Sequence, residues 1–382
     1  MGSRARTAEA LGNASGKAYA GAMSPAPKQA KLTAILARAS ALALASACGD
    51  EPLAARAEAD ASTQAHELDF DAVSQLDAQE DRQAPEDIAR LGLHEVSLPE
   101  VSESSGLDTA STPLDAGQVW TPLIAARPYG FRLPVQYDPA KAWPLVILLH
   151  GYVESAPFID GWLKIGDEVD SQSFLLAVPE GTKDQTGVRY WNATNACCDL
   201  FANKVDDVGY LKAVIADMKW KFHVDPKRVY VMGHSNGAFM AHRLACEMAD
   251  QIAGIVALSG VNYAEASACK PSAPVSVLQV HGTLDPVIAY LGGILPGGVY
   301  PSAKASTSAW AARNGCQEKP SADKNLDLDL LVPFAETTVQ RWSGCKGGAA
   351  ELWTTWGGDH FLKPKKDVAA RLIGWLQGHP KP

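Results

Sequence analysis

The chain has 382 residues, a formal net charge of -9 and a hydrophobic content of 47%. It contains no stripe of basic residues, which argues against nucleic acid as a partner. Its length exceeds that of one average domain, but its composition is uneven, because all ten tryptophans lie at or after Trp120. We therefore predict that the packed part of the protein begins near Trp120.

The first 48 residues carry the pattern of a targeting signal. Two lysines precede an apolar run that is too short to favour a membrane-spanning helix, and small residues then lead to Cys48. The pattern is similar to a bacterial lipoprotein signal, although Ala45 stands where leucine is usual. We predict an export signal over residues 1–48, with Met23 as the true start and Cys48 as a candidate for lipid attachment.

The segment that follows is acidic. Between residues 50 and 115 the only cations are Arg56, Arg82 and Arg90, and no apolar period is sustained. Such a segment cannot bury enough surface to offset the entropy lost on ordering. We predict a disordered acidic spacer over residues 49–118, with a few weak helices around the sequence DFDAVSQLDA as the alternative. Much of the net charge belongs to this spacer and not to the packed domain.

From residue 119 to the end, apolar runs alternate with helical stretches. The runs that predict strands are 144–150, 173–181, 228–233, 252–260, 274–282 and 350–356. The predicted helices cover 206–221, 236–249, 302–313 and 366–377. This alternation predicts a single α/β domain over 119–382, with a mostly parallel central sheet and helices on both faces. In such folds the loops at the carboxyl ends of the strands hold the chemistry.

The sequence GHSNG at 233–237 matches the pattern G-x-S-x-G. It stands between a predicted strand and a predicted helix, which is the context that the pattern needs to lift a serine hydroxyl above a sheet. Glycine-serine turns are common, so the string alone also fits an ordinary turn. The strand-turn-helix context favours Ser235 as a candidate nucleophile.

A serine hydroxyl needs a base to take its proton and a carboxylate to orient that base. In this type of fold the three residues follow the chain order Ser, Asp, His. Asp285 comes just after the predicted strand 274–282, and His360 comes just after 350–356. We predict a catalytic triad of Ser235, Asp285 and His360.

The neighbouring candidates fit structural roles better. His234 adjoins the serine in a tight turn, points a different way, and is interpreted as packing or loop support. His281 is expected to fix the loop that carries Asp285, and Asp359 points away from the ring of the histidine that follows it. Packing roles are also favoured for two further histidines in or beside helical stretches, His223 and His242.

Attack on a carbonyl produces an oxyanion that needs two preorganised N–H donors. One comes from the residue after the nucleophile, which is Asn236, and the other from the loop after the first strand. There His150 and Gly151 end an apolar run, and the backbone N–H of Tyr152 is the expected donor. An ordinary strand-ending turn is the alternative for this loop.

Six cysteines remain after Cys48. Their even number in an exported domain predicts disulfides, in one of about 15 formal connectivities. Their spacing does not fit a zinc site. We expect Cys316 to pair with Cys345, because both flank the predicted strand TTVQRW in the same late segment. The others are Cys197, Cys198, Cys246 and Cys269.

Five segments occur together in order: ARPYGFRLPVQYDPAKAWPLVILLHGY, YWNATNACCDLFANKVDDVGYLKAVI, DPKRVYVMGHSNGAFMAHRLAC, HGTLDPVIAY and ELWTTWGGDHF. They resemble the polyhydroxybutyrate depolymerase-like esterase family, which is related to feruloyl and acetylxylan esterases. The resemblance covers most of residues 125–378 and implies an α/β-hydrolase fold that cleaves carboxylic esters without a cofactor. It assigns the roles of nucleophile, base and orienting acid to Ser235, His360 and Asp285.

The substrate clues are fewer. Trp191 and Tyr152 are expected to bind substrate as aromatic walls of the acyl cleft, which would suit a chain of ester units. Packing against a disulfide of Cys197 or Cys198 is the equal alternative for Trp191. A calcium site is an alternative to helix capping at three acidic residues near one helix start, although no metal site is predicted. These residues are Asp199, Asp206 and Asp207.

The sequence therefore predicts an exported serine carboxylic-ester hydrolase, secreted or lipid-anchored in a bacterial cell envelope. Its substrates are expected to be short acyl, hydroxyacyl or aromatic esters, with polyester oligomers among them. The alternatives are a serine peptidase of the same fold and a non-catalytic surface binding lipoprotein. No cofactor and no nucleic-acid partner are predicted, and contact with a membrane is expected only through Cys48.

Overall fold

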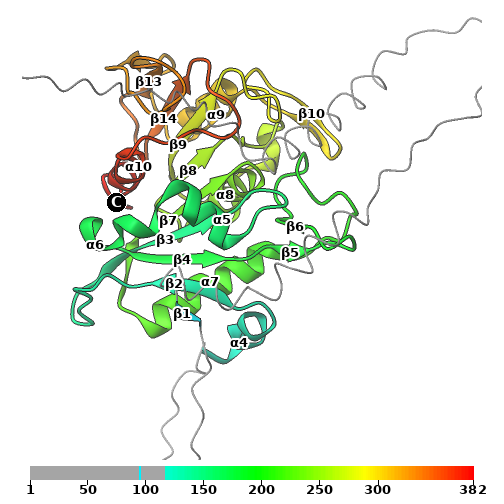
Figure 1. Ribbon diagram of the computed structural model, residues 1–382, viewed down its shortest axis with the longest axis vertical. Coiled ribbons are helices and arrows are strands. Elements are labelled where there is room, and N and C mark those ends of the chain that lie inside the picture. The colour runs from blue at the N-terminus through cyan, green and yellow to red at the C-terminus, as the bar shows by residue number, and fades with distance from the viewer. Residues whose placement is uncertain (1–93, 96–116) are drawn as a thin grey trace, which may run out of the picture.

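The computed structural model describes residues 94–95 and 117–382. The predicted export signal with Cys48, and nearly all of the predicted spacer, lie outside the described residues. The described part is built on a ten-stranded sheet with the order β1-β2-β4-β3-β7-β8-β9-β14-β13-β12 (Figure 1). Its strands are β1 His94–Glu95, β2 Tyr129–Arg132, β3 Trp143–Leu149, β4 Leu175–Pro179, β7 Val224–His234, β8 Gly254–Leu258, β9 Ser276–Gly282, β12 Ser321–Ala322, β13 Thr337–Trp342 and β14 Ala350–Thr355.

The middle of this sheet is parallel and its two edges are antiparallel. β4, β3, β7, β8, β9 and β14 pair in parallel. β2 and β1 add antiparallel strands at one edge, and β13 and β12 at the other. The six parallel strands coincide with the six predicted from apolar runs, so the predicted α/β class is confirmed.

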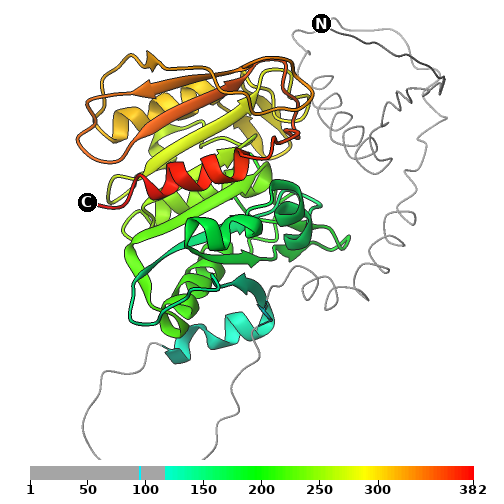
Figure 2. The same ribbon diagram turned by 60° about the vertical axis from the view of Figure 1, so that its left-hand side comes forward.

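Helices cover both faces of the sheet. Their bounds are α4 Gly117–Ala126, α5 Ala156–Leu163, α6 Val169–Gln172, α7 Asp207–Lys221, α8 Asn236–Glu247, α9 Ala303–Arg313 and α10 Val368–Gln377. In Figure 2 the red helix α10 lies across the near face of the sheet. Two small hairpins extend from the loops: β5 Thr182–Lys183 with β6 Arg189–Tyr190, and β10 Gly293–Leu295 with β11 Gly298–Tyr300.

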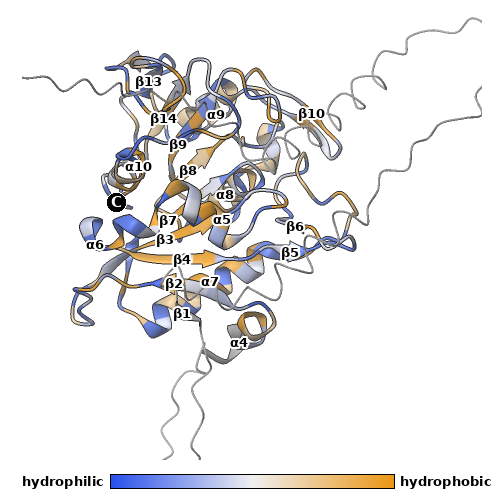
Figure 3. Ribbon diagram, viewed as in Figure 1, coloured by the Kyte–Doolittle hydropathy of each residue, from blue (hydrophilic) through white to orange (hydrophobic). Residues whose placement is uncertain are grey.

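The core consists of two large apolar clusters, one on each face of the sheet. Along β3, Leu145 and Ile147 enter the cluster that contains residues of α7 and α8. Between them, Val146 enters the cluster that contains residues of α5 and α10. Because both faces are covered, β3 and β4 are apolar along their whole length instead of alternating, and they appear orange in Figure 3.

The four predicted helices are all present, as α7, α8, α9 and α10. The short helix α5 was not predicted from the sequence. It begins after Ser155, whose Oγ accepts the N–H of Phe158 at 3.4 Å, and proline occupies its first turn. The helix has only eight residues, and one of them is a glycine, so its apolar period is too short to recognise in the sequence.

Three disulfides join the six cysteines of the domain. Cys316 pairs with Cys345, as predicted, and the bridge spans β13. Cys246 at the end of α8 pairs with Cys269, and the neighbours Cys197 and Cys198 pair with each other. Within residues 94–95 and 117–382, no helix combines the length and apolarity needed to cross a membrane.

His242 on α8 is buried completely, so its protonation is coupled to folding. Burial lowers its pKa from 6.5 to about 4, and the hydrogen bond that the ring donates to Oε1 of Gln279 opposes this only in part. The unfolded chain therefore binds a proton between these two pH values, and the folded chain does not. The contribution of the neutral ring to stability is fully present above pH 6.5 and is lost as the pH falls toward 4.

We therefore predict that the stability advantage of the wild type over a His242→Gln variant shrinks with acid. The decrease should approach about 3 kcal/mol, since one pKa unit corresponds to about 1.4 kcal/mol. Urea denaturation of both proteins from neutral pH down to about pH 4 measures it. Parallel stability curves for the two proteins would contradict the prediction.

Candidate active site

Ser235 is the single residue between the end of β7 and the start of α8. Its backbone has φ 51° and ψ -118°, a conformation that non-glycine residues rarely adopt. A Cβ atom on Gly233 would lie 2.2 Å from the carbonyl oxygen of Gly237, and one on Gly237 would lie 2.4 Å from that of Leu149. Both glycines of the motif are therefore required by the close approach of the backbone, and the turn stores strain at the serine.

Asp285, three residues after β9, receives hydrogen bonds at both carboxylate oxygens. Oδ1 accepts the backbone N–H groups of Val287 and Ile288, each at 2.8 Å. Oδ2 lies 2.8 Å from Nδ1 of His360 and 3.3 Å from Nε2 of His281. Burial opposes the charged form, but the two histidines outweigh burial and hold the pKa of Asp285 well below its usual range. An ionised carboxylate is therefore directed at the ring of His360.

The loops that carry these two residues are joined to each other. Leu284 donates its N–H to the carbonyl oxygen of Gly358 at 2.9 Å, and Gly357 donates to Oγ1 of Thr283 at 2.9 Å. β9 and β14 are parallel neighbours, with Gly282 paired to Thr355. The order of strands in the sheet thus brings together residues that are 75 positions apart in the chain.

The loop after β3 is held so that one N–H group stays free. His150 accepts the N–H of Gly181 at Nε2, so its Nδ1 carries the proton and donates to the carbonyl oxygen of Gly151 at 2.7 Å. In a planar trans peptide the N–H of Tyr152 points opposite to that carbonyl. Among the hydrogen bonds of residues 117–382, neither this N–H nor that of Asn236 has a protein acceptor.

Tyr152 and Trp191, the two aromatic residues predicted to line the cleft, differ in exposure. Tyr152 is half-buried, and burial raises the pKa of its hydroxyl to about 12. Trp191 is buried completely, and its indole N–H donates to the carbonyl oxygen of His150 at 3.0 Å. Its backbone N–H and C=O both bond the side chain of Asn236, at 2.7 and 2.9 Å.

Trp191 therefore does not face an open cleft in this structure. It connects the loop after β3 to the start of α8, the two places that supply the free N–H groups. The packing alternative stated for Trp191 agrees with its burial, because Trp191 belongs to the same buried apolar cluster as Cys197. Its ring also stacks on Tyr210 and lies beside His150. The side chain of Asn236 reaches the sulfur of Cys197 as well, at 3.5 Å.

One buried carboxylate of the site was missed in the sequence. Glu154 accepts the N–H of Gly151 at 2.7 Å and pairs with Nδ1 of His234 at 2.9 Å. Nε2 of His234 in turn lies 3.1 Å from the carbonyl oxygen of His360, which also accepts from Ser259. Burial raises the pKa of the Glu154 carboxyl, but His234 and the Gly151 N–H outweigh it and lower the pKa overall.

This pair joins the loop after β3, the Ser235 turn and the His360 loop. A glutamate in the loop after an apolar strand was a visible signal, but its partner lies 80 residues further along the chain. The interpretation of His234 as loop support agrees with this geometry.

We predict that Glu154→Gln loosens all three loops. Glutamine keeps the volume, but its amide cannot accept from both Gly151 and His234 as the carboxylate does. We expect kcat/KM to fall about 10- to 100-fold and the free energy of unfolding to fall by about 2–4 kcal/mol. Glu247→Gln, at a surface pair with Arg243, is the matched control and should change little. Wild-type kinetics and stability in Glu154→Gln would contradict this role.

The acidic residues weighed as a calcium site are occupied by protein donors. Asp206 caps α7 by accepting the N–H of Gly209, and Asp207 pairs with Arg127 at 2.7 Å. Asp199 accepts N–H groups of the chain that follows it. In the described part of the chain no group of three acidic, histidine or cysteine side chains is arranged to hold a metal ion.

The strand order, the covering helices and the serine turn after β7 together define the architecture. This is the α/β-hydrolase fold. A model of the phospholipase/carboxylesterase family matches residues 133–297. In this α/β-hydrolase domain the matched part contains Ser235 and Asp285 and ends before His360.

Two curated relatives and one solved structure are similar to the α/β-hydrolase domain. Feruloyl esterase B of Piromyces equi is 29% identical over 60% of this chain and 41% of its own length. Poly(3-hydroxyalkanoate) depolymerase C of Paucimonas lemoignei is 29% identical over 51% of this chain and 46% of its own length. The chain thus spans less than half the length of either relative. The predicted resemblance to this group of esterases is confirmed.

The solved structure of an acetyl xylan esterase from Aspergillus awamori has a TM-score of 0.50 against this chain. It is 16% identical and covers 65% of this chain and 94% of its own. At this identity the likeness supports the α/β-hydrolase fold alone.

Proposed function

We propose that the protein is an exported serine hydrolase of carboxylic esters, with Ser235, His360 and Asp285 as its catalytic triad. The observation that carries the proposal is a strained serine turn joined through His234 to the backbone of His360, whose Nδ1 lies 2.8 Å from an ionised aspartate. The names of the similar proteins, a feruloyl esterase and a polyhydroxyalkanoate depolymerase, support the ester class.

In the proposed mechanism the neutral ring of His360 takes the proton of Ser235 through Nε2. The serine oxygen attacks the ester carbonyl, and Asp285 stabilises the imidazolium that forms. The free N–H groups of Tyr152 and Asn236 receive the oxyanion. His360 then protonates the leaving alcohol, and water repeats the attack on the acyl-enzyme. No step requires a cofactor.

The proposed substrates are short acyl, hydroxyacyl or aromatic esters, including oligomers of a polyester. The ring of Tyr152 is half-buried and belongs to the residue whose N–H is one proposed oxyanion donor, so it is the proposed aromatic wall of the acyl site. With Trp191 buried, support for an aromatic substrate rests on Tyr152 and on the named relatives alone.

The test is a panel of esters offered to the purified full chain and to its Ser235→Ala variant. The panel contains short and long p-nitrophenyl esters, methyl ferulate, a hydroxybutyrate oligomer and an aromatic polyester fragment. Serine-dependent turnover is the expected result, and its rank order names the acyl group. If no ester is cleaved, peptides are offered next: their cleavage would favour a serine peptidase, and no cleavage of either kind would favour a binding protein.

We also propose export, with a lipid anchor at Cys48. The support is the sequence pattern of residues 1–48, and the lipid would be the only contact with a membrane. Mass spectrometry of the full protein extracted from a bacterial envelope should show a diacylated N-terminal cysteine. An unmodified Cys48 in that fraction would rule out the anchor.

A further inference from the structure

A chain of buried polar groups runs from α9 to the triad carboxylate. The indole Nε1 of Trp310 lies 3.0 Å from Nδ1 of His242, whose Nε2 lies 3.2 Å from Oε1 of Gln279. Nε2 of Gln279 lies 3.4 Å from Nδ1 of His281, and Nε2 of His281 lies 3.3 Å from Oδ2 of Asp285. All five side chains are buried. The mechanism above uses only the last of them.

The direction of every hydrogen bond in this chain is set by its first member. An indole nitrogen can only donate, so Nδ1 of His242 accepts and its proton is on Nε2. That proton points at Oε1 of Gln279, so the amide nitrogen of Gln279 faces the other way. The amide nitrogen donates to the carbonyl oxygen of Gly260 at 2.9 Å and faces Nδ1 of His281. Nδ1 of His281 therefore accepts as well.

The proton of His281 is left on Nε2, where two acceptors lie. The carbonyl oxygen of Ile288 is 2.8 Å away and Oδ2 of Asp285 is 3.3 Å away. The low pKa of His242 supports this assignment, because burial keeps its ring neutral and a neutral ring donates through one nitrogen only. Reversing the direction at any link would place two acceptors or two donors face to face.

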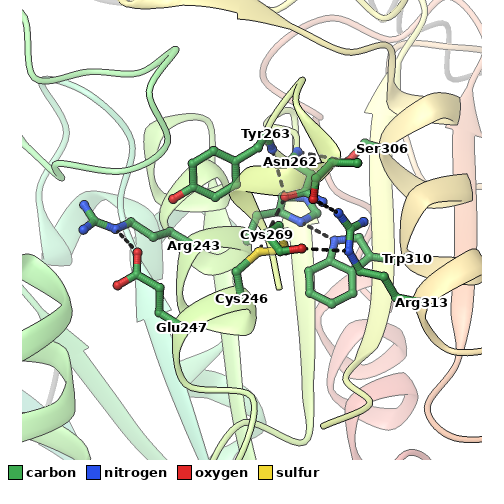
Figure 4. Close-up of a disulfide and its surroundings, with 11 residues drawn as sticks. Arg243, Cys246, Glu247, Asn262, Tyr263, Cys269, Ser306, Trp310 and Arg313 are labelled. Atoms are coloured by element: carbon green, nitrogen blue, oxygen red, sulfur yellow. Dashed lines mark hydrogen bonds and ion pairs between the residues drawn. A yellow bond between two sulfur atoms is a disulfide. The ribbon is translucent and has the colours of Figure 1, made fainter. Parts of the chain in front are cut away.

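The first member of the chain is itself held in place. Figure 4 shows Trp310 beside the disulfide of Cys246 and Cys269. Arg313, one turn further along α9, lies 5.4 Å from the centre of the indole and donates to the carbonyl oxygen of Cys269 at 3.2 Å. The disulfide and Arg313 thus fix α9 against α8, the helix that carries His242.

We propose that Trp310 and His242 are positioning residues, which act through Gln279 to keep the proton of His281 on Nε2 and so hold the Asp285 carboxylate toward His360. Oδ1 of Asp285 is already held by two backbone N–H groups. The Nε2–H group of His281, 3.3 Å from Oδ2, keeps this oxygen from turning away from His360. This inference rests on the proposed function in taking Asp285 as the orienting acid.

The test compares Trp310→Phe with Trp375→Phe in the full chain. Both changes remove one buried indole N–H and keep an aromatic ring, and Trp375 donates to Glu351 at 3.2 Å, outside the chain of groups. Trp310→Phe is expected to lower kcat about three- to tenfold with KM nearly unchanged, as loss of one bond of a coupled network would. Trp375→Phe should lower Tm similarly and leave kcat within about twofold. Each rate is divided by the concentration of reactive serine, which is measured by titration with a fluorophosphonate.

A spectroscopic readout separates positioning from general loss of stability. Nδ1 of His360 lies 2.8 Å from a carboxylate oxygen of Asp285. The proton between these two atoms should give a resolved downfield proton resonance. Trp310→Phe should shift or broaden this resonance, and Trp375→Phe should leave it in place. Equal behaviour of the two variants, in kcat and in this resonance, would overturn the proposal.

Imidazole nitrogen NMR of the wild type tests the same proposal without any substrate. His242 and His281 should both appear as neutral rings protonated at Nε2. A proton on Nδ1 of His281, or a charged ring there, would overturn the inference even if the protein is an esterase. If the protein cleaves no ester, the proposed function fails, and these nitrogen signals still decide the state of the chain of groups.

Discussion

Ser235→Ala is expected to abolish turnover, with kcat lower by about 10⁴- to 10⁶-fold, the loss typical of removing a triad nucleophile. Alanine has no oxygen to form the acyl-enzyme, while the oxyanion donors and the cleft stay in place. KM should therefore change little. The fold should be retained, because the hydroxyl makes no capping hydrogen bond to α8.

The matched control is Ser276→Ala. Ser276 is also buried, but it starts β9 and accepts the N–H of Ala349 at 3.1 Å, so it stands at the opposite end of that strand from the candidate site. Its loss should lower Tm slightly and leave kcat near the wild-type value. Near wild-type kcat in Ser235→Ala would remove the serine mechanism altogether.

Asp285→Asn is expected to lower kcat by about 10⁴-fold, as in other triads whose acid becomes an amide. Oδ2 of the carboxylate accepts from His360 and lies 3.3 Å from Nε2 of His281. An amide that keeps its oxygen toward the two backbone N–H groups must turn its NH₂ toward both rings. His360 would then carry its proton on Nε2, the nitrogen that must be free to accept the proton of Ser235.

Asp359→Asn is the control, because this neighbouring carboxylate is exposed and, among residues 117–382, bonds only the backbone N–H of His360, at 2.6 Å. An amide oxygen can accept the same bond. We expect kcat to stay within about threefold of the wild type, as for most surface substitutions. If Asp359→Asn proves the more damaging of the two changes, the orienting acid has been assigned to the wrong carboxylate.

The buried position of Trp191 changes which residues are expected to shape the proposed acyl site. Its indole holds His150, and its backbone holds the side chain of Asn236. Both proposed oxyanion donors therefore share one buried support. The aromatic wall is left to Tyr152, beside which Val153 has the positive φ of 61° that is rare for a β-branched residue. Strain in this loop is thus adjacent to the proposed donor.

The elements and the candidate triad were predictable from sequence for local reasons. A strand buried on both faces reads as a mainly apolar run, which marked β3, the second half of β7, and β9. The serine turn needs its glycines two residues away on each side, so Ser235 carries a short-range signature. Asp285 and His360 follow directly after such strands, and parallel strands bring their carboxyl ends to one edge of the sheet.

The supporting contacts depend on the tertiary structure, because their partners are distant in the chain. Glu154 meets His234 across 80 residues, and Trp310 meets His242 across 68. No spacing rule connects such pairs, since their meeting depends on how helices and loops pack on the finished sheet. The same packing covers the ring of Trp191, which sequence alone left equally fit for a cleft or a core. Sequence therefore determined which residues end the strands, and the packing of α8, α9 and the loops decided which side chains hold them in place.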